Sequence, residues 1–74
     1  MVSVKVAYLS TGKPAKNQKV SIGFSGLFRG FSETAYTNYD GEAHFDNDPG
    51  DGIIYINGNP LFKGFVAGMK VIYI

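Results

Sequence analysis

Cysteine is absent from this 74-residue chain, and its absence removes two common sources of stability in small domains. No disulfide can staple the fold, and no thiolate can hold a structural zinc ion. The chain also lacks a charge excess, because seven basic residues against six acidic ones leave a formal charge of +1. Such a chain has no long-range field to gather polyanions, so neither nucleic acid nor membrane is an expected partner.

Long apolar runs and helical periodicity are missing as well. Residues 1–6 alternate in polarity instead of forming the apolar stretch of a signal peptide, which favours a cytoplasmic location. No window of eleven or more residues repeats its apolar positions every 3.6 residues, so we expect essentially no helix. At 45% hydrophobic residues the chain is nevertheless too apolar for a disordered segment. It has room for one domain, residues 1–74, with a thin core.

What the chain does contain is the alternation of β-strands. Alternating apolar residues predict strands at about 2–9 and 19–25, and the β-branched run 69–74 predicts a final strand. Asp40-Gly41 predicts a tight hairpin that pairs strands at 33–37 and 42–45; Asn57-Gly58 predicts a second hairpin, from 53–56 into a sixth strand. We therefore expect an all-β domain, a small Greek-key β-sandwich of six to seven short, mostly antiparallel strands. A five- or six-stranded OB-like open barrel is the alternative.

The order of the turn and strand motifs resembles a known superfamily. The motifs are Gly12-Lys13-Pro14, Lys19-Val20-Ser21-Ile22, the segment 37–45 with sequence TNYDGEAHF, and Pro49-Gly50. Over roughly residues 1–56 they are similar to the prealbumin-like domains related to the carboxypeptidase regulatory domain and to transthyretin-like repeats. The match departs from the usual form at Asn38, where an Asp is common, and in the short ending after Asn57. The resemblance implies a seven-stranded sandwich that serves as an accessory or structural module, with no catalytic residue to carry over.

A five-residue pattern occurs twice in the chain. It reads Leu27-Phe28-Arg29-Gly30-Phe31 and then Leu61-Phe62-Lys63-Gly64-Phe65, so each copy sets two Phe rings beside a cation. Large apolar side chains beside glycine can complete a thin core or form an exposed contact surface. We take Leu27, Phe28, Arg29, Phe31, Leu61, Phe62, Lys63 and Phe65 as the candidate interaction residues. The apolar final strand would add a sheet edge that invites pairing.

Two acidic groups could bind a cation. Asp46, Asp48 and Asp51 lie in a loop over residues 46–52, and oxygen ligands are what calcium requires. The loop lacks the closing Glu of a helix-loop-helix site, so calcium is possible but a turn is favoured. Glu42, His44 and Asp46 alternate along one strand and should share its solvated outer face.

The composition offers few of the side chains that catalysis commonly uses. The chain has a single His, and Gly23-Phe24-Ser25-Gly26 lacks the spacing of a nucleophile elbow. We therefore expect no enzyme and no cofactor, but a structural or protein-interaction module that self-associates through its Phe-rich segments or a sheet edge. The alternative is a ligand-binding module in which Phe28, Tyr36, Tyr39 and Phe62 form a platform for carbohydrate or nucleic-acid bases.

Overall fold

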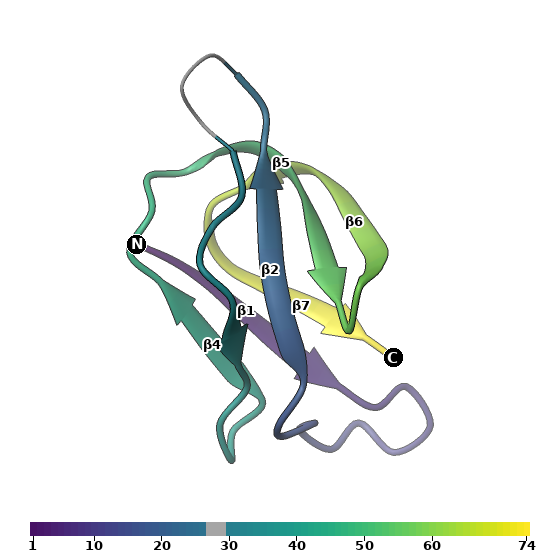
Figure 1. Cartoon of the computed structure of the whole chain (residues 1–74). Coiled ribbons are helices and arrows are strands. Elements are labelled where there is room, and N and C mark those ends of the chain that lie inside the picture. Colours follow the sequence, from purple (N-terminus) through teal and green to yellow (C-terminus); the bar gives the residue numbers. More distant parts are fainter. Residues whose placement is uncertain (27–29) are drawn as a thin grey trace.

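The computed structural model describes residues 1–26 and 30–74, which fold into a seven-stranded β-sandwich (Figure 1). The strands are β1 (Val2–Ala7), β2 (Lys19–Phe24), β3 (Ala35–Tyr36), β4 (Glu42–Phe45), β5 (Gly50–Ile56), β6 (Asn59–Val66) and β7 (Gly68–Tyr73). One sheet has the order β4-β1-β7 and the other the order β3-β2-β5-β6. The predicted all-β sandwich is confirmed: all pairings between these strands are antiparallel except that of β1 with β7. The described residues contain no helix, and so none that could cross a membrane.

Alternation along the strands builds the core between the two sheets. Val2, Val4 and Val6 of β1 are fully buried, and they face the equally buried Ile22 and Ile54 of the other sheet. Ser3 and Lys5 between them are partly exposed on the opposite face, as the period of a strand requires. The predicted buried face is confirmed for Val2, Val4 and Val6. It is wrong for Tyr8, because β1 ends at Ala7 and Tyr8 is 41% exposed.

The β5–β6 hairpin forms at Asn57-Gly58, as predicted. Asn57 and Gly58 have φ values of 52° and 84°, and two consecutive positive φ angles match the twist of paired strands. The strand before it is longer than predicted, because β5 already begins at Gly50. Part of the expected acidic loop is therefore strand.

The predicted hairpin at Asp40-Gly41 is wrong. The segment before it joins one sheet, where Tyr36 lies opposite Lys19, while β4 joins the other sheet as the partner of β1. The turn docks on β1, since the Gly41 carbonyl accepts a 2.7 Å hydrogen bond from the Val6 N–H. This bond ties the turn to β1 and so carries the chain from one sheet to the other.

A buried threonine fixes the same crossing. Thr37 is 2% exposed, and its hydroxyl donates a 2.6 Å hydrogen bond to the Ala15 carbonyl. Its oxygen also accepts a 2.9 Å hydrogen bond from the Gln18 N–H. The β1–β2 loop and the chain after β3 are thus tied together at the end of the sandwich.

Candidate interaction surface

The two repeat segments behave alike at their last residue. Phe31 is 71% exposed and Phe65 is 58% exposed. Each follows a glycine with positive φ, 150° at Gly30 and 153° at Gly64, a region that L side chains rarely adopt. Leu27, Phe28 and Arg29 of the first copy lie outside the described residues.

Strand register puts both phenylalanines on the outer face of the four-stranded sheet. Phe31 forms a bridge to Gly23, whose partner on β5 is Ile53. Ile53 in turn lies opposite Lys63 on β6, and Phe65 is two residues further along the same strand. Phe31 and Phe65, the last residues of two copies that are 34 positions apart in sequence, therefore lie on one face of the sheet.

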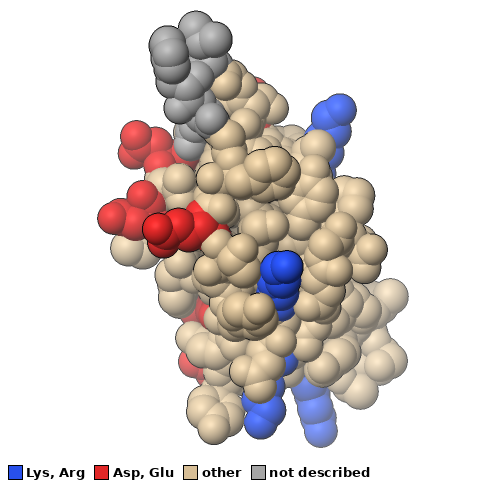
Figure 2. All heavy atoms as spheres, viewed as in Figure 1, with Lys and Arg blue, Asp and Glu red and all other residues tan. Residues whose placement is uncertain are grey.

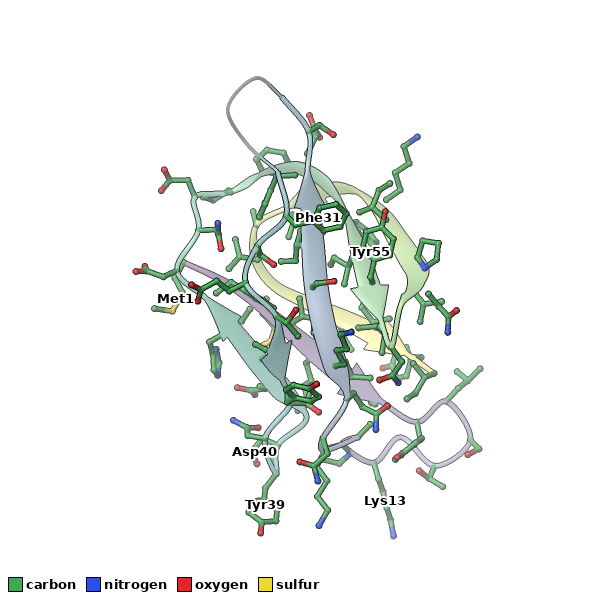
Figure 3. All side chains as sticks on the ribbon, in the orientation of Figure 1. Met1, Lys13, Phe31, Tyr39, Asp40 and Tyr55 are labelled. Carbon is green, nitrogen blue, oxygen red and sulfur yellow. The ribbon has the colours of Figure 1, made fainter. Side chains whose placement is uncertain are left out.

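Phe31 is held on that face by a glycine and a tyrosine. Its ring covers Gly23 so closely that a Cβ there would lie 3.2 Å from the ring. The ring centroid lies 5.6 Å from that of Tyr55 at a 40° angle, in the range of favourable tilted pairs. Figure 3 shows the two rings side by side over β2 and β5. We call the surface formed by Phe31, Ile53, Tyr55, Leu61 and Phe65 the Phe face.

Charged groups are sparse on the side of the molecule that carries the Phe face. Figure 2 shows that side as a broad, mostly uncharged area with single lysines, and most of its acidic groups lie along one flank. The sequence explains the segregation, because all six Asp and Glu residues lie between residues 33 and 51 and no Lys or Arg does.

Phe62 differs from the other described candidates. It is half-buried and packs against the core, and the ammonium of Lys70 lies 5.0 Å from its ring centroid. Leu61, by contrast, is 45% exposed. The sequence pattern alone did not separate the core Phe of this copy from its surface Phe. Strand alternation counted back from the apolar Val66 places Phe65 on the outer face and Phe62 on the inner face, and would have distinguished the two.

The three described residues of the alternative platform, Tyr36, Tyr39 and Phe62, do not come together. Tyr36 lies on the outer side of β3, opposite Lys19. Tyr39 is 83% exposed at the β3–β4 turn, where the Lys16 ammonium lies 5.0 Å from its ring. Phe62 points inward, and Phe28 lies outside the described residues.

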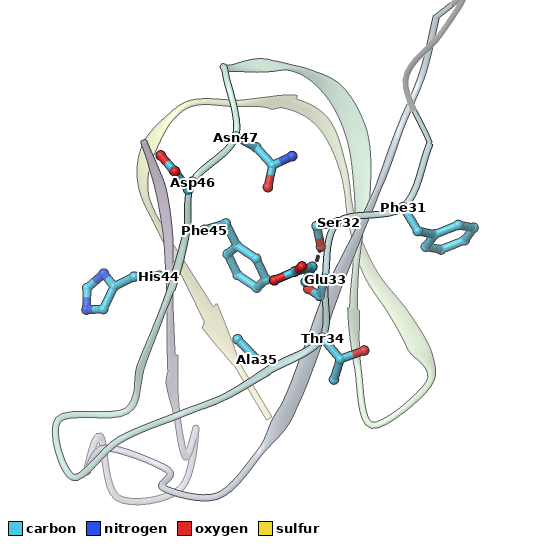
Figure 4. Close-up of a pocket in the computed structure, with 9 residues that line it drawn as sticks. All are labelled: Phe31, Ser32, Glu33, Thr34, Ala35, His44, Phe45, Asp46 and Asn47. Carbon is cyan, nitrogen blue, oxygen red and sulfur yellow. Dashed lines mark hydrogen bonds between the residues drawn. The ribbon is translucent and has the colours of Figure 1, made fainter.

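A polar hollow of about 510 Å³ opens on the acidic flank, between segments 31–35 and 44–47. Phe45 and Ala35 point into it, together with the carboxylate of Glu33, whereas His44 and Phe31 point away (Figure 4). In the described part of the chain no three His, Asp or Glu side chains lie close enough to hold a metal ion. The structure thus does not gather Asp46, Asp48 and Asp51 into a cation site.

The outer face of β4 is solvated, as predicted. His44 and Asp46 are exposed and Glu42 is partly exposed, while Ala43 and Phe45 between them are buried. One contact was missed from the sequence: the Ser3 hydroxyl lies 2.7 Å from His44 Nδ1. These residues are 41 positions apart, so only the register of β1 against β4 could reveal it.

Comparison with known proteins gives no relative. No family model, no curated protein and no solved structure matches this chain.

Proposed function

We propose that this protein is a structural or protein-interaction module that self-associates through the Phe face. The observation that carries the proposal is the placement of Phe31 and Phe65, one from each repeat, as exposed rings on one surface. Contiguous exposed apolar side chains on a small domain commonly mark a contact site. The prealbumin-like relationship is part of the same proposal and is supported by the order of the sequence motifs.

A second copy of the chain is the partner that the charges of this face favour. Asp51 and Lys63 lie diagonally on neighbouring strands of the same face, since Asp51 pairs with Phe65 and Lys63 with Ile53. Two copies related by a two-fold axis present the same patch to each other, so Lys63 of one copy can face Asp51 of its partner. The face is therefore self-complementary in sign as well as apolar.

Its size predicts a weak dimer. A stable specific interface buries about 800 Å² on each partner, whereas the whole chain exposes 4616 Å². Four strands spaced about 4.8 Å apart cover a width of only about 15–20 Å. The whole face must therefore take part, and we expect an equilibrium between monomer and dimer that depends on concentration.

Light scattering over a hundredfold concentration range tests this proposal. The unmodified chain should rise from 8.0 kDa towards twice that mass. Phe31→Ser and Phe65→Ser should stay monomeric and folded, because both side chains are exposed. Tyr39→Ser is the matched control, since it removes an exposed aromatic side chain from outside the Phe face. A mass that is unchanged by both Phe substitutions would refute the proposal, and a monomer throughout would leave the Phe face as a ligand platform.

The β7 edge is the second candidate surface. Ile74 bonds through both its N–H and its carbonyl to the β1 side, at Ala7 and Leu9. The backbone N–H and carbonyl groups of alternate residues in a strand point to opposite sides. Those of Met69, Val71 and Tyr73 therefore point to the free edge of β7. Their side chains are 47–55% exposed. If pairing occurs here, Val71→Lys should abolish the dimer while Phe65→Ser leaves it intact.

A further inference from the structure

The outer face of the three-stranded sheet brings together a serine, a histidine and a glutamate. Ser3 on β1 lies directly opposite His44 on β4, and Lys5 lies opposite Glu42. The Ser3 hydroxyl is 2.7 Å from His44 Nδ1, and Glu42 Oε1 is 3.4 Å from His44 Nε2. The imidazole ring thus lies between a hydroxyl and a carboxylate.

The carboxylate favours the tautomer that can activate the serine. The negative charge of Glu42 beside Nε2 favours a proton on that nitrogen, which leaves Nδ1 of the neutral ring as an acceptor. Ser3 then donates its hydroxyl proton to Nδ1. A nucleophile, a base and an oriented carboxylate are the elements of serine-dependent acyl transfer, although here Nδ1 faces the serine.

The third strand completes the surroundings of Ser3. Met69 lies directly opposite Ser3 on the β7 side, and Val71 lies opposite Lys5. Both side chains are about half exposed, at 47% and 48%. Ser3 therefore has its base on one side and an apolar side chain on the other, with the cationic Lys5 two residues along the same face.

We propose that Ser3 is an activated nucleophile and that this face is an acyl-transfer site for esters with an apolar acyl group. His44 is the general base, and Glu42 is a positioning residue. The acyl chain would lie on Met69 and Val71, and the ammonium of Lys5 is the charged group available to a developing oxyanion. The proposal departs from the expectation that this chain has no catalytic residue.

The chemical step balances without a cofactor. Ser3 Oγ attacks the ester carbonyl carbon while its proton passes to His44 Nδ1. The tetrahedral species then collapses, the bond to the leaving alkoxide breaks, and that alkoxide takes the proton from His44. Water attacks the acyl-serine by the same sequence and releases the carboxylic acid and free Ser3. The reaction should be slow, because His44 is exposed to water and an open site weakens electrostatic stabilisation.

This site is independent of the proposed dimer. The Phe face belongs to the four-stranded sheet, whereas Ser3, His44 and Glu42 are on the other sheet (Figure 1). Self-association through the Phe face would leave Ser3 open to solvent. The two proposals can therefore fail separately.

An alkyl fluorophosphonate tests the nucleophile directly. Ser3 Oγ attacks phosphorus, fluoride leaves, and His44 takes the proton, so the product carries a stable adduct that mass spectrometry can map. We expect one adduct, on Ser3, that is absent in Ser3→Ala and forms at least about tenfold more slowly in His44→Gln. Ser21→Ala is the matched control: Ser21 is also partly exposed on the outer face of a strand, but it lies opposite Tyr55.

A test of Glu42 must distinguish a positioning role from a general loss of structure. Glu42→Gln keeps an oxygen that can accept from Nε2 and should label faster than Glu42→Ala, with both variants giving the unmodified circular dichroism spectrum. Hydrolysis of p-nitrophenyl butyrate should follow the same order. Labelling spread over several hydroxyls, or equal rates for the unmodified chain and His44→Gln, would overturn the proposal.

Discussion

Two glycines with nearly the same backbone conformation should respond very differently to substitution by alanine. Gly41 and Gly58 have φ values of 75° and 84°. A Cβ at Gly41 would collide with the Val6 carbonyl oxygen and lie 3.1 Å from Pro14 Cβ. A Cβ at Gly58 would meet nothing within 4 Å. The pair therefore separates the cost of the conformation from the cost of the contact.

The magnitudes follow from those surroundings. An L residue in the left-handed region costs about 1–2 kcal/mol, and both variants carry that cost. Gly41→Ala must also move the turn away from β1, which breaks the hydrogen bond between Val6 and Gly41 and leaves polar groups unpaired, at about 1–3 kcal/mol more. A 74-residue domain has roughly 4–11 kcal/mol of stability in all. Gly41→Ala should thus remove a large part of it.

Thermal unfolding followed by far-ultraviolet circular dichroism measures the Tm of both variants. At about 4–8 °C per kcal/mol, Gly58→Ala should lower Tm by about 4–16 °C and Gly41→Ala by about 8–40 °C. Both should be measured at one low protein concentration, so that self-association does not contribute. Equal losses in the two variants would show that docking of the turn on β1 does not hold β4 in its sheet.

Three further outcomes are expected. Phe62→Ala should lower the free energy of unfolding by about 2–4 kcal/mol because its ring packs against the core, whereas Phe65→Ala should lower it by less than about 1 kcal/mol. Similar losses in urea unfolding would contradict the assignment of the two rings to opposite faces. Thr37→Val should cost about 2–4 kcal/mol, since it leaves the Ala15 carbonyl and the Gln18 N–H without their partner, and Thr37→Ser should restore most of that loss. Millimolar calcium should leave Tm unchanged, as no three acidic or His side chains are gathered in the described residues; a clear rise would reveal a site in the acidic loop.

The two candidate surfaces differ in whether neighbouring residues in the sequence or long-range strand pairing determines them. Exposure of Phe65 follows from alternation with Val66, so the sequence contained that information even though the repeat pattern drew attention equally to Phe62. The contact between Ser3 and His44 could not be read in the same way. It depends on which strand lies beside β1, and a shift of one residue in that register would send one of the two side chains to the core.

The sequence by itself determined the strands, the Asn57-Gly58 hairpin and the faces that are buried, because those properties depend on the two-residue period of a strand and on local turn chemistry. Only the tertiary structure decided that the chain after β3 changes sheets. Asp40-Gly41 is equally compatible with a hairpin, and the outcome depends on how the turn docks against Val6 and on the buried Thr37, contacts distant in sequence. The same long-range packing assembled the Phe face and placed Ser3 beside His44, since side chains from separate strands become neighbours only once strand order and register are set.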